Sequence, residues 1–403
     1  MRSVLFVSIF VLLLISKLYA YAHPVLSGSY AITIMGATDT VSVGLEFLAT
    51  AIGLYLSFTT KEYRQILNQI GGYFYFLAFI LLLWLLLSVS EVGLVNTLYS
   101  PTSPLGYIPI FLVFLGGDDS CWRLLKKIAP LFALIYFLLC YSAYQTYAVA
   151  AGMRLAGNTP IIVYLVSTVW WLAVSVVNFR GNKPVIQILV MALLVSCALM
   201  AFSLTFRSWI IQSVLLLILA FLQLGESKHK KILWIIVLAI IVIYAVNYIS
   251  TSSDWSEFVL AFENKNKIDT RGFQYSDMFN QIPLLTWIFG GGIDATYIAS
   301  HSYEAYKYID NQYLFTLFHY GVFLLVPWLV IWLKGIFGLL KKHIDISQKS
   351  IGYVCILWLC ALGGLSVYNV IVINPQNIIM TIALGRCYAI SLKDKTVCSK
   401  DAC

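Results

Sequence analysis

Apolar and polar stretches alternate regularly along most of this chain of 403 residues. There are twelve apolar stretches, each close to the roughly 20 residues that a helix needs to cross a bilayer. They cover residues 4–22, 41–58, 71–90, 93–115, 128–150, 160–178, 185–204, 208–224, 232–250, 312–333, 351–368 and 376–391. The fourth is interrupted by Pro101, Pro104 and Pro109. The pattern predicts an all-α fold, a polytopic integral membrane helical bundle of about 12 transmembrane helices.

One polar gap is much longer than the others and runs over residues 251–311, between the ninth and tenth stretches. It contains more acidic than basic residues. Within it, the apolar residues of Phe273–Pro283 have the spacing of a short amphipathic helix that lies on a membrane. We therefore expect residues 1–403 to form a single membrane domain with one large loop that contains short helices.

Lysine and arginine predict the orientation, because cytoplasmic segments carry an excess of them. If the N-terminus is inside, every inner segment is basic. The basic residues of these segments are Arg2, Lys61, Arg64, Arg123, Lys126, Lys127, Arg180, Lys183, Lys228, Lys230, Lys231, Lys334, Lys341, Lys342, Lys349, Lys393, Lys395 and Lys400. The short outer loops offer only Arg154 and Arg207, with Lys17 near the end of the first stretch. Both chain ends are thus predicted to be cytoplasmic, and the large loop lies on the opposite face.

The N-terminal stretch has a second interpretation. Arg2, the apolar run Val4–Ile15 and the pattern Ala20-Tyr21-Ala22 imitate a secretory signal peptide with its cleavage site. We expect an uncleaved first span. Cleavage would remove one span without inverting the others.

Composition excludes several classes of protein. Hydrophobic residues make up 61% of the chain and charged residues 11%, whereas a soluble domain carries about 25% charged residues. The formal charge of +8 is scattered over short loops and forms no basic face, which argues against nucleic acid as a partner. None of the eight cysteines falls in a predicted outer loop, so we expect no disulfide. No Cys/His cluster indicates a metal site, and we expect no cofactor.

Three arginines on the predicted outer face are candidates for binding an anion. Arg207 opens an apolar stretch, Arg271 lies in the large loop, and Arg154 lies in a short outer loop. Each has an ordinary interpretation as well. Arg207 could extend to phospholipid headgroups, and Arg271 could form a surface salt bridge with Asp269 or Asp277. A guanidinium also binds phosphate through two parallel hydrogen bonds, which is the functional interpretation.

Asp310 is the candidate general base, because it lies where the chain re-enters the bilayer and a carboxylate can accept a proton from a sugar hydroxyl. It could equally be the N-cap of the following helix. His301 in the same loop is an alternative base. His319 lies deeper, and we interpret it as a packing or polar-network residue. Glu46 and Arg386 are the clearest charges inside predicted spans, and Arg386 is close enough to the inner face to reach it.

The Gly290-Gly291-Gly292 run follows an apolar segment in the large loop. Three glycines permit a sharp turn and a close approach of main chain. The run lacks the strand that would precede a nucleotide-binding loop, so by itself it indicates a turn.

Together these features resemble the O-antigen polymerase family, a branch of the O-antigen polymerase and ligase superfamily of membrane glycosyltransferases. The resemblance covers about residues 200–325. Its features, in order, are Thr205-Phe206-Arg207-Ser208-Trp209, Arg271 in the long outer loop, Ile288-Phe289-Gly290-Gly291-Gly292, and Asp310-Asn311-Gln312-Tyr313-Leu314 followed by Gly321. The first half of the chain matches only in being a run of spans.

The resemblance implies an enzyme of the bacterial cytoplasmic (inner) membrane that polymerises oligosaccharide repeats carried on undecaprenyl diphosphate at the outer face. It implies Arg207 and Arg271, joined by Arg154, as ligands of the leaving diphosphate, with Asp310 or His301 as the base. Gly290, Gly292, Asn311 and Tyr313 would belong to the substrate-binding loop. The expected partners are the lipid-linked oligosaccharide, membrane lipids and a chain-length regulator protein.

Two alternatives remain at this point. Related ligases have a histidine before the asparagine of the last motif, where this chain has Asp310, and this departure favours a polymerase over an O-antigen ligase. A flippase or transporter of lipid-linked oligosaccharide is the alternative from another class. Transporters often have inverted repeats and charges near the bilayer midplane, and the sequence has no visible repeat and few such charges.

Overall fold

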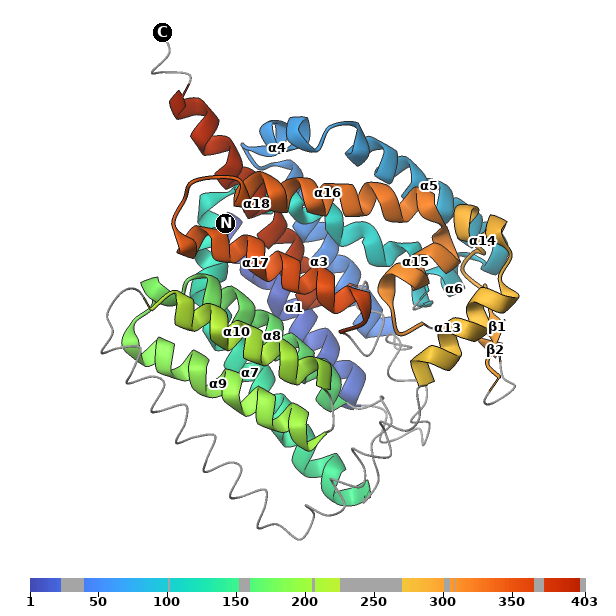
Figure 1. The fold of residues 1–403 in the computed structure, drawn as a ribbon, viewed down its shortest axis with the longest axis horizontal. Coiled ribbons are helices and arrows are strands. Elements are labelled where there is room, and N and C mark those ends of the chain that lie inside the picture. Colours follow the sequence, from blue (N-terminus) through green and yellow to red (C-terminus); the bar gives the residue numbers. More distant parts are fainter. Residues whose placement is uncertain are drawn as a thin grey trace.

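The computed structural model describes residues 1–22, 40–100, 102–151, 160–204, 207–224, 270–300, 305–307, 309–365 and 373–398. Within these ranges the chain is almost entirely helical (Figure 1). The two short strands, β1 (Tyr297–Ile298) and β2 (Ala305–Tyr306), pair antiparallel. The predicted all-α class is confirmed.

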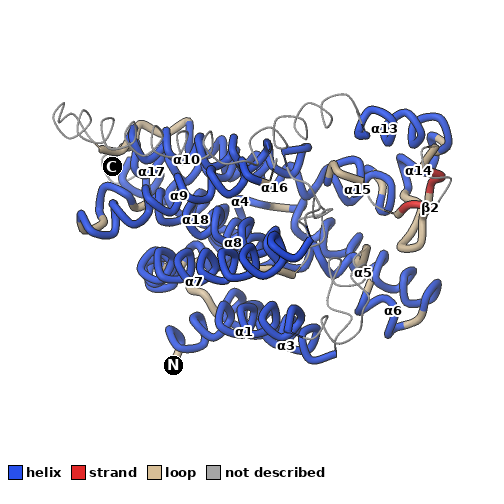
Figure 2. Tube along the Cα trace, turned by 90° about the horizontal axis from the view of Figure 1, so that it is seen from below, coloured by secondary structure: helices blue, strands red, loops and turns tan. Residues whose placement is uncertain are grey.

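The helices follow one another in this order: α1 (Arg2–Ala22), α3 (Thr40–Phe58), α4 (Tyr63–Ile70), α5 (Gly72–Val92), α6 (Leu94–Tyr99), the 3-10 helix η1 (Pro104–Gly117), α7 (Asp119–Ala151), α8 (Pro160–Val177), the 3-10 turn η2 (Phe179–Gly181), α9 (Pro184–Ser203), α10 (Arg207–Leu222), α13 (Thr270–Gln281), α14 (Leu284–Phe289), α15 (Gln312–Tyr320), α16 (Val322–Leu340), α17 (Ile346–Cys360), the π-helical turn η3 (Ala361–Leu365) and α18 (Pro375–Cys398). Long helices run side by side through the bundle, and α13 and α14 lie with the strands at one end of it (Figures 1 and 2).

Seven helices in the described part of the chain are long and apolar enough to cross a membrane. They span Arg2–Ala20, Thr40–Phe58, Gly72–Val92, Asp119–Gln145, Pro184–Ser203, Val322–Leu340 and Ile346–Gly363. Three apolar helices are shorter: Pro104–Gly117, Ile161–Val177 and Ser208–Leu222. The prediction of several apolar helices long enough to cross a membrane is therefore confirmed, whereas the total of twelve spans stays a prediction. The predicted span 232–250 lies outside the described residues.

Two predicted spans differ from the structure. The stretch 312–333 is not one helix, because α15 ends at Tyr320 and α16 begins at Val322 after Gly321, whose φ is 73°. The stretch 93–115 is also divided, into α6 and the 3-10 helix η1, with the prolines noted above between and within them. Apolarity predicted both stretches, but it does not register a change of helix direction or type.

The 3-10 helix η1 is a buried element that packs closely on α18. A Cβ atom at Gly385 would lie 1.6 Å from the carbonyl oxygen of Val113, and one at Gly116 would lie 2.2 Å from that of Ile382. The main chains therefore touch directly. The Ser57 hydroxyl donates to the Phe111 carbonyl at 2.7 Å, which satisfies a main-chain acceptor inside the bundle.

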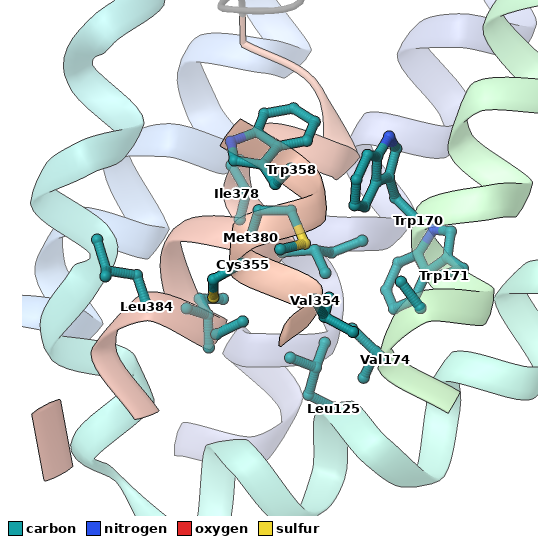
Figure 3. Close-up of a cluster of buried hydrophobic side chains, with 14 of the residues drawn as sticks. Leu125, Trp170, Trp171, Val174, Val354, Cys355, Trp358, Ile378, Met380 and Leu384 are labelled. Carbon is teal, nitrogen blue, oxygen red and sulfur yellow. The ribbon is translucent and has the colours of Figure 1, made fainter. Parts of the chain in front are cut away.

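Buried apolar side chains from α7, α8, α17 and α18 pack together inside the bundle, and Trp170, Trp171 and Trp358 are among them (Figure 3). Trp170 and Trp358 pack edge to face with their ring centroids 4.8 Å apart. Trp171 stacks on Phe132 at 4.8 Å. Such aromatic contacts add about 0.5–1.5 kcal/mol beyond the area that they bury.

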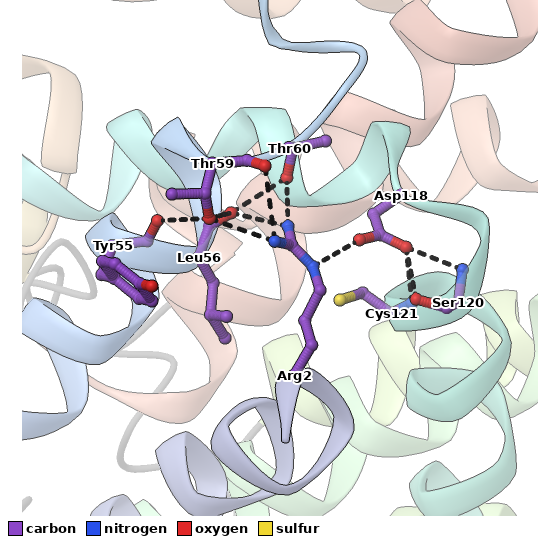
Figure 4. Close-up of polar contacts among 8 residues, drawn as sticks. All are labelled: Arg2, Tyr55, Leu56, Thr59, Thr60, Asp118, Ser120 and Cys121. Atoms are coloured by element: carbon purple, nitrogen blue, oxygen red, sulfur yellow. Dashed lines mark hydrogen bonds and ion pairs between the residues drawn. The ribbon is translucent and has the colours of Figure 1, made fainter.

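The predicted inner segments meet at the end of the bundle opposite α13. Arg2 bridges three of them (Figure 4). Its Nε donates to Asp118 at 2.7 Å, and its Nη2 donates to the carbonyl of Leu56 at 2.7 Å and to the hydroxyl of Thr60 at 2.6 Å. Asp118 in turn accepts from the main-chain N–H of Ser120 at 2.8 Å, which caps the first turn of α7.

Glu46, the predicted intramembrane acid, forms an ion pair that the sequence did not reveal. Its carboxylate lies 2.6 Å from Lys17 Nζ, and both side chains are largely buried, with exposed fractions of 14% and 13%. The Ser16 hydroxyl donates to the same carboxylate oxygen at 3.1 Å. The pair joins α1 to α3.

We expect Glu46→Ala to lower the free energy of unfolding by about 3 kcal/mol, because it leaves the buried Lys17 ammonium without its counter-charge. Thermal unfolding of the purified protein in detergent measures this. Glu46→Gln keeps an acceptor for Lys17 and should cost less. Glu91→Ala, which removes an exposed glutamate from the end of α5, is the control and should change stability by less than about 0.5 kcal/mol. Equal stability of Glu46→Ala and Glu91→Ala would contradict the expectation.

Candidate functional site

The helix predicted in Phe273–Pro283 is confirmed as α13, and one face of it is bound to the strands. Gln274 Nε2 donates to the Tyr297 hydroxyl at 2.8 Å. Gln281 forms two hydrogen bonds with the main chain of Ile298, at 2.7 and 2.8 Å. Asp277 accepts from the N–H and hydroxyl of Ser300, both at 2.9 Å. The three side chains recur every three or four residues, so they share one face.

The glycine-rich turn packs against the C-terminal end of α15. The N–H groups of Gly291 and Gly292 donate to the carbonyls of Phe318 and His319 at 2.8 and 3.0 Å. A Cβ atom at Gly290 would lie 2.6 Å from the His319 carbonyl oxygen, and Gly290 and Gly292 have φ values of 89° and 91°. Gly290 is required because main chain meets main chain there, and Gly292 is required because of its positive φ and the Glu91 carboxylate beside it.

His319 holds this arrangement from inside. It is fully buried, and its Nδ1 and Nε2 lie 2.7 and 2.8 Å from the carbonyl oxygens of Gly292 and Lys307. The imidazole therefore links α15 to the glycine-rich turn and to the end of β2. Its interpretation as a polar-network residue is confirmed.

The N-cap of α15 is Asn311. Its Oδ1 accepts from the main-chain N–H groups of Tyr313 and Leu314 at 3.0 and 3.3 Å. The alternative interpretation of Asp310 as the cap is therefore wrong by one residue. Asn311 takes that structural task, and the carboxylate of Asp310 is not needed for it.

Asp310 lies partly buried beside α13. Its main-chain N–H donates to Gln274 Oε1 at 3.3 Å. Position 271 precedes Gln274 by one turn of the same helix. Burial raises the pKa of the neighbouring Tyr297 to about 12, and the negative charge of Asp310 adds to the rise. The Tyr297 hydroxyl therefore stays a neutral hydrogen-bonding group beside Asp310.

A buried polar network lies beneath this end of α15. Gln312 Nε2 donates to the Tyr107 hydroxyl at 3.3 Å, and that hydroxyl lies 2.5 Å from Thr316 Oγ1. Asn377 Nδ2 donates to the carbonyl of Gly106 at 3.2 Å. The network joins α15 and α18 to η1. The sequence alone did not reveal this network, although polar residues inside apolar stretches are a signal for such buried contacts.

Asn311 and Tyr313 also fasten α15 to the end of α17. Asn311 Nδ2 donates to the Gly363 carbonyl at 3.1 Å, and the Tyr313 hydroxyl donates to the Leu359 carbonyl at 2.6 Å. The turn η3, which contains Gly363, contacts both α15 and α10. The helix that Arg207 opens and the helix that follows Asp310 thus share a neighbour.

Some of the predicted site residues are described in full, some only by their main chain, and some lie outside the described residues. Asp310, Asn311, Tyr313, Gly290 and Gly292 lie together around α15, as reported above. Arg207 and Arg271 lie in the first turns of α10 and α13, but their side chains are outside the described part. His301 and Arg154 lie outside the described residues. The alternative pairing of Arg271 with Asp269 or Asp277 stays a prediction, because the Arg271 side chain lies outside the described part.

A cavity of about 320 Å³ opens at this end, lined by Val92, Asn96, Tyr99, Ser100, Asp294 and Lys307. Lys307 and Asp294 form an ion pair across it. The sequence did not predict this cavity, because its lining residues form no local motif and come together only through the fold.

Comparison with known proteins adds no assignment. No protein-family model matches the chain, and no match is found among curated proteins.

Proposed function

We propose that this protein polymerises oligosaccharide repeats carried on undecaprenyl diphosphate at the outer face of a bacterial inner membrane. The observation that carries the proposal is Asp310, a partly buried residue at the end of the helical bundle, adjacent to α13 and directly before Asn311, the N-cap of α15. The substrate is a lipid, so a site at the end of transmembrane helices gives it access from the bilayer.

The proposed reaction is a glycosyl transfer. A hydroxyl at the nonreducing end of the new repeat attacks the anomeric carbon of the growing chain, and the bond from that carbon to the diphosphate oxygen breaks. Asp310 takes the proton from the attacking hydroxyl. Arg207 and Arg271, with Arg154, stabilise the negative charge that develops on the departing lipid diphosphate. The donor is already activated, so these residues suffice in principle.

The apolar surface of α13 and α14 supports a position at the membrane. Phe273 and Phe279 are 56% and 60% exposed, and Leu284 and Leu285 are 74% and 66% exposed. Exposed apolar side chains on short helices next to transmembrane helices are typical of segments that lie in the bilayer interface. A lipid-linked substrate would meet the site at that depth.

We expect Arg207→Ala and Arg271→Ala each to reduce polymer formation by about 10²-fold, because each removes a cation that faces the leaving diphosphate in the transition state. Polysaccharide length on gels, in a strain that lacks the native protein and carries each variant, measures the effect. Lys307→Ala is the matched control, since it removes a cation of the same region that is already paired with Asp294. Full-length polymer from both arginine variants would rule out the proposed binding of the leaving diphosphate by Arg207 and Arg271.

The same strain separates the alternatives. Loss of a polymerase leaves single repeats on the lipopolysaccharide core, whereas loss of a ligase leaves none. A purified flippase would move lipid-linked sugar across a vesicle membrane without lengthening it. Extension of a lipid-linked repeat by the purified protein therefore supports the polymerase, and translocation without extension contradicts it.

A further inference from the structure

A second cavity lies at the opposite end of the bundle, among the predicted inner segments. It has a volume of about 370 Å³ and forms where α7, the end of α8, the start of α17 and α18 meet. Three basic side chains line it: Lys126, Arg180 and Arg386. They come from segments far apart in sequence, so no local sequence motif predicts the cluster.

The cations are only partly neutralised. Arg386 Nη1 lies 2.5 Å from Asp119, and Arg180 lies 3.9 Å from Asp345 in a pair whose side chains are 62% and 54% exposed. Lys126 is half-buried, and its Nζ donates to a neutral acceptor, the Asn178 amide oxygen, at 3.2 Å. Two acidic groups thus face three basic ones around the cavity.

Arg386 carries an unused donor. Its guanidinium lies 5.9 Å from the centre of the Trp122 ring, which helps to fix its position. In the described part of the chain its Nε–H is buried without a hydrogen-bond acceptor. A buried donor without an acceptor costs about 1–3 kcal/mol, so an acceptor that reaches this nitrogen would recover the energy.

The start of α17 also lies at the cavity, with Asp345 at its N-terminal end, where the Ser347 hydroxyl donates to this carboxylate at 2.8 Å. Ser347 and Gln348, in the first turn of this 15-residue helix, line the cavity. The N–H groups of a first turn are positively polarised and favour anions. The cavity therefore combines side-chain cations and neutral polar groups with a helix end that already faces the Asp345 carboxylate.

We propose that this cavity binds a phosphate group, supplied either by the headgroup of an anionic phospholipid or by soluble phosphate. Phosphate matches the fork of donors that arginine offers. One water takes about 30 Å³ in the liquid, so the space holds a phosphate together with part of a headgroup. The site involves other residues than the proposed polymerase site and lies at the other end of the bundle, so either proposal can fail without the other.

Binding to the purified full-length protein in phosphatidylcholine nanodiscs tests this, with phosphatidylglycerol as the lipid probe and inorganic phosphate as the soluble probe. We expect Lys126→Gln to weaken phosphate-dependent binding about tenfold, since it removes a charged hydrogen bond. Lys127→Gln is the matched control. Lys127 is the adjacent residue on the same helix, is exposed and does not line the cavity, yet its substitution removes the same charge.

The outcomes are distinct. Binding of phosphatidylglycerol that weakens in Lys126→Gln but not in Lys127→Gln, without competition by inorganic phosphate, supports a lipid headgroup. Competition by inorganic phosphate supports a soluble source. Equal weakening in both variants, or no binding of either probe, overturns the proposal. If Lys126→Gln does not fold, Arg180→Gln replaces it, because that side chain is more than half exposed, and should weaken binding about fivefold.

Discussion

Asp310→Asn should reduce the rate of polymer extension by about 10²–10⁴-fold, the usual contribution of a general base. Asparagine has nearly the same shape as aspartate but cannot take up the proton of the attacking hydroxyl. The main-chain hydrogen bond from position 310 to Gln274 and the Asn311 cap remain, so the fold of α15 should be unchanged. The initial rate with purified protein and a lipid-linked repeat measures the loss.

The control for this variant is Asp294→Asn. Asp294 is a carboxylate at the same end of the bundle, but it is paired with Lys307 and belongs to the other side of the glycine-rich turn. We expect nearly normal extension from it. Extension by Asp310→Asn at a rate within threefold of the native protein, with normal folding, would remove Asp310 from the mechanism and leave His301 as the candidate base.

Gly321→Ala should lower the free energy of unfolding by about 2–6 kcal/mol, from two causes. Gly321 has φ 73° and ψ −178°, a conformation that costs a residue with a side chain about 1–3 kcal/mol. In addition, a Cβ atom would lie 2.3 Å from the carbonyl oxygen of Ile288 and 2.7 Å from the nitrogen of Gly290. Main chain cannot move aside as a side chain can, and such overpacking costs about 1–3 kcal/mol more.

Gly93→Ala separates the two causes. Gly93 has a similar conformation, φ 82° and ψ 162°, but a Cβ atom there would meet nothing within 4 Å. We expect it to cost only the conformational part, about 1–3 kcal/mol. Thermal unfolding of both variants in detergent gives the comparison. Equal losses would show that the contact between the glycine-rich turn and Gly321 does not hold this end of the bundle together.

Asp310 and Gly321 belong to the same structural unit, which is α15 with the glycine-rich turn packed against its end. The break at Gly321 separates α15 from α16, and the glycine-rich turn packs against the break. As a result α15 is a short independent helix, and its N-terminal end at Asn311 brings Asp310 beside α13. A disturbance at Gly321 should therefore also reduce polymer extension, although Gly321 itself touches no reacting group.

The sequence by itself determined the helical class, the presence of apolar helices long enough to cross a membrane, such as Pro184–Ser203, and the helix α13 in the large polar segment. These follow from the apolar pattern, because the preference of each side chain for lipid or water is a local property that the sequence contains directly. The same pattern placed Asp310 at the start of a helix but missed the cap by one residue, since aspartate and asparagine are nearly equal as caps.

Only the tertiary structure decided which distant groups meet. Lys17 pairs with Glu46 across 29 positions, Tyr107 meets Thr316 across 209, and Lys126, Arg180 and Arg386 share one cavity. It also decided that 312–333 is two helices, because the requirement for glycine at 321 comes from the main chain of Ile288 and not from its sequence neighbours. Such contacts depend on how the helices pack against one another. The pattern of apolar and polar residues along the sequence does not specify that packing.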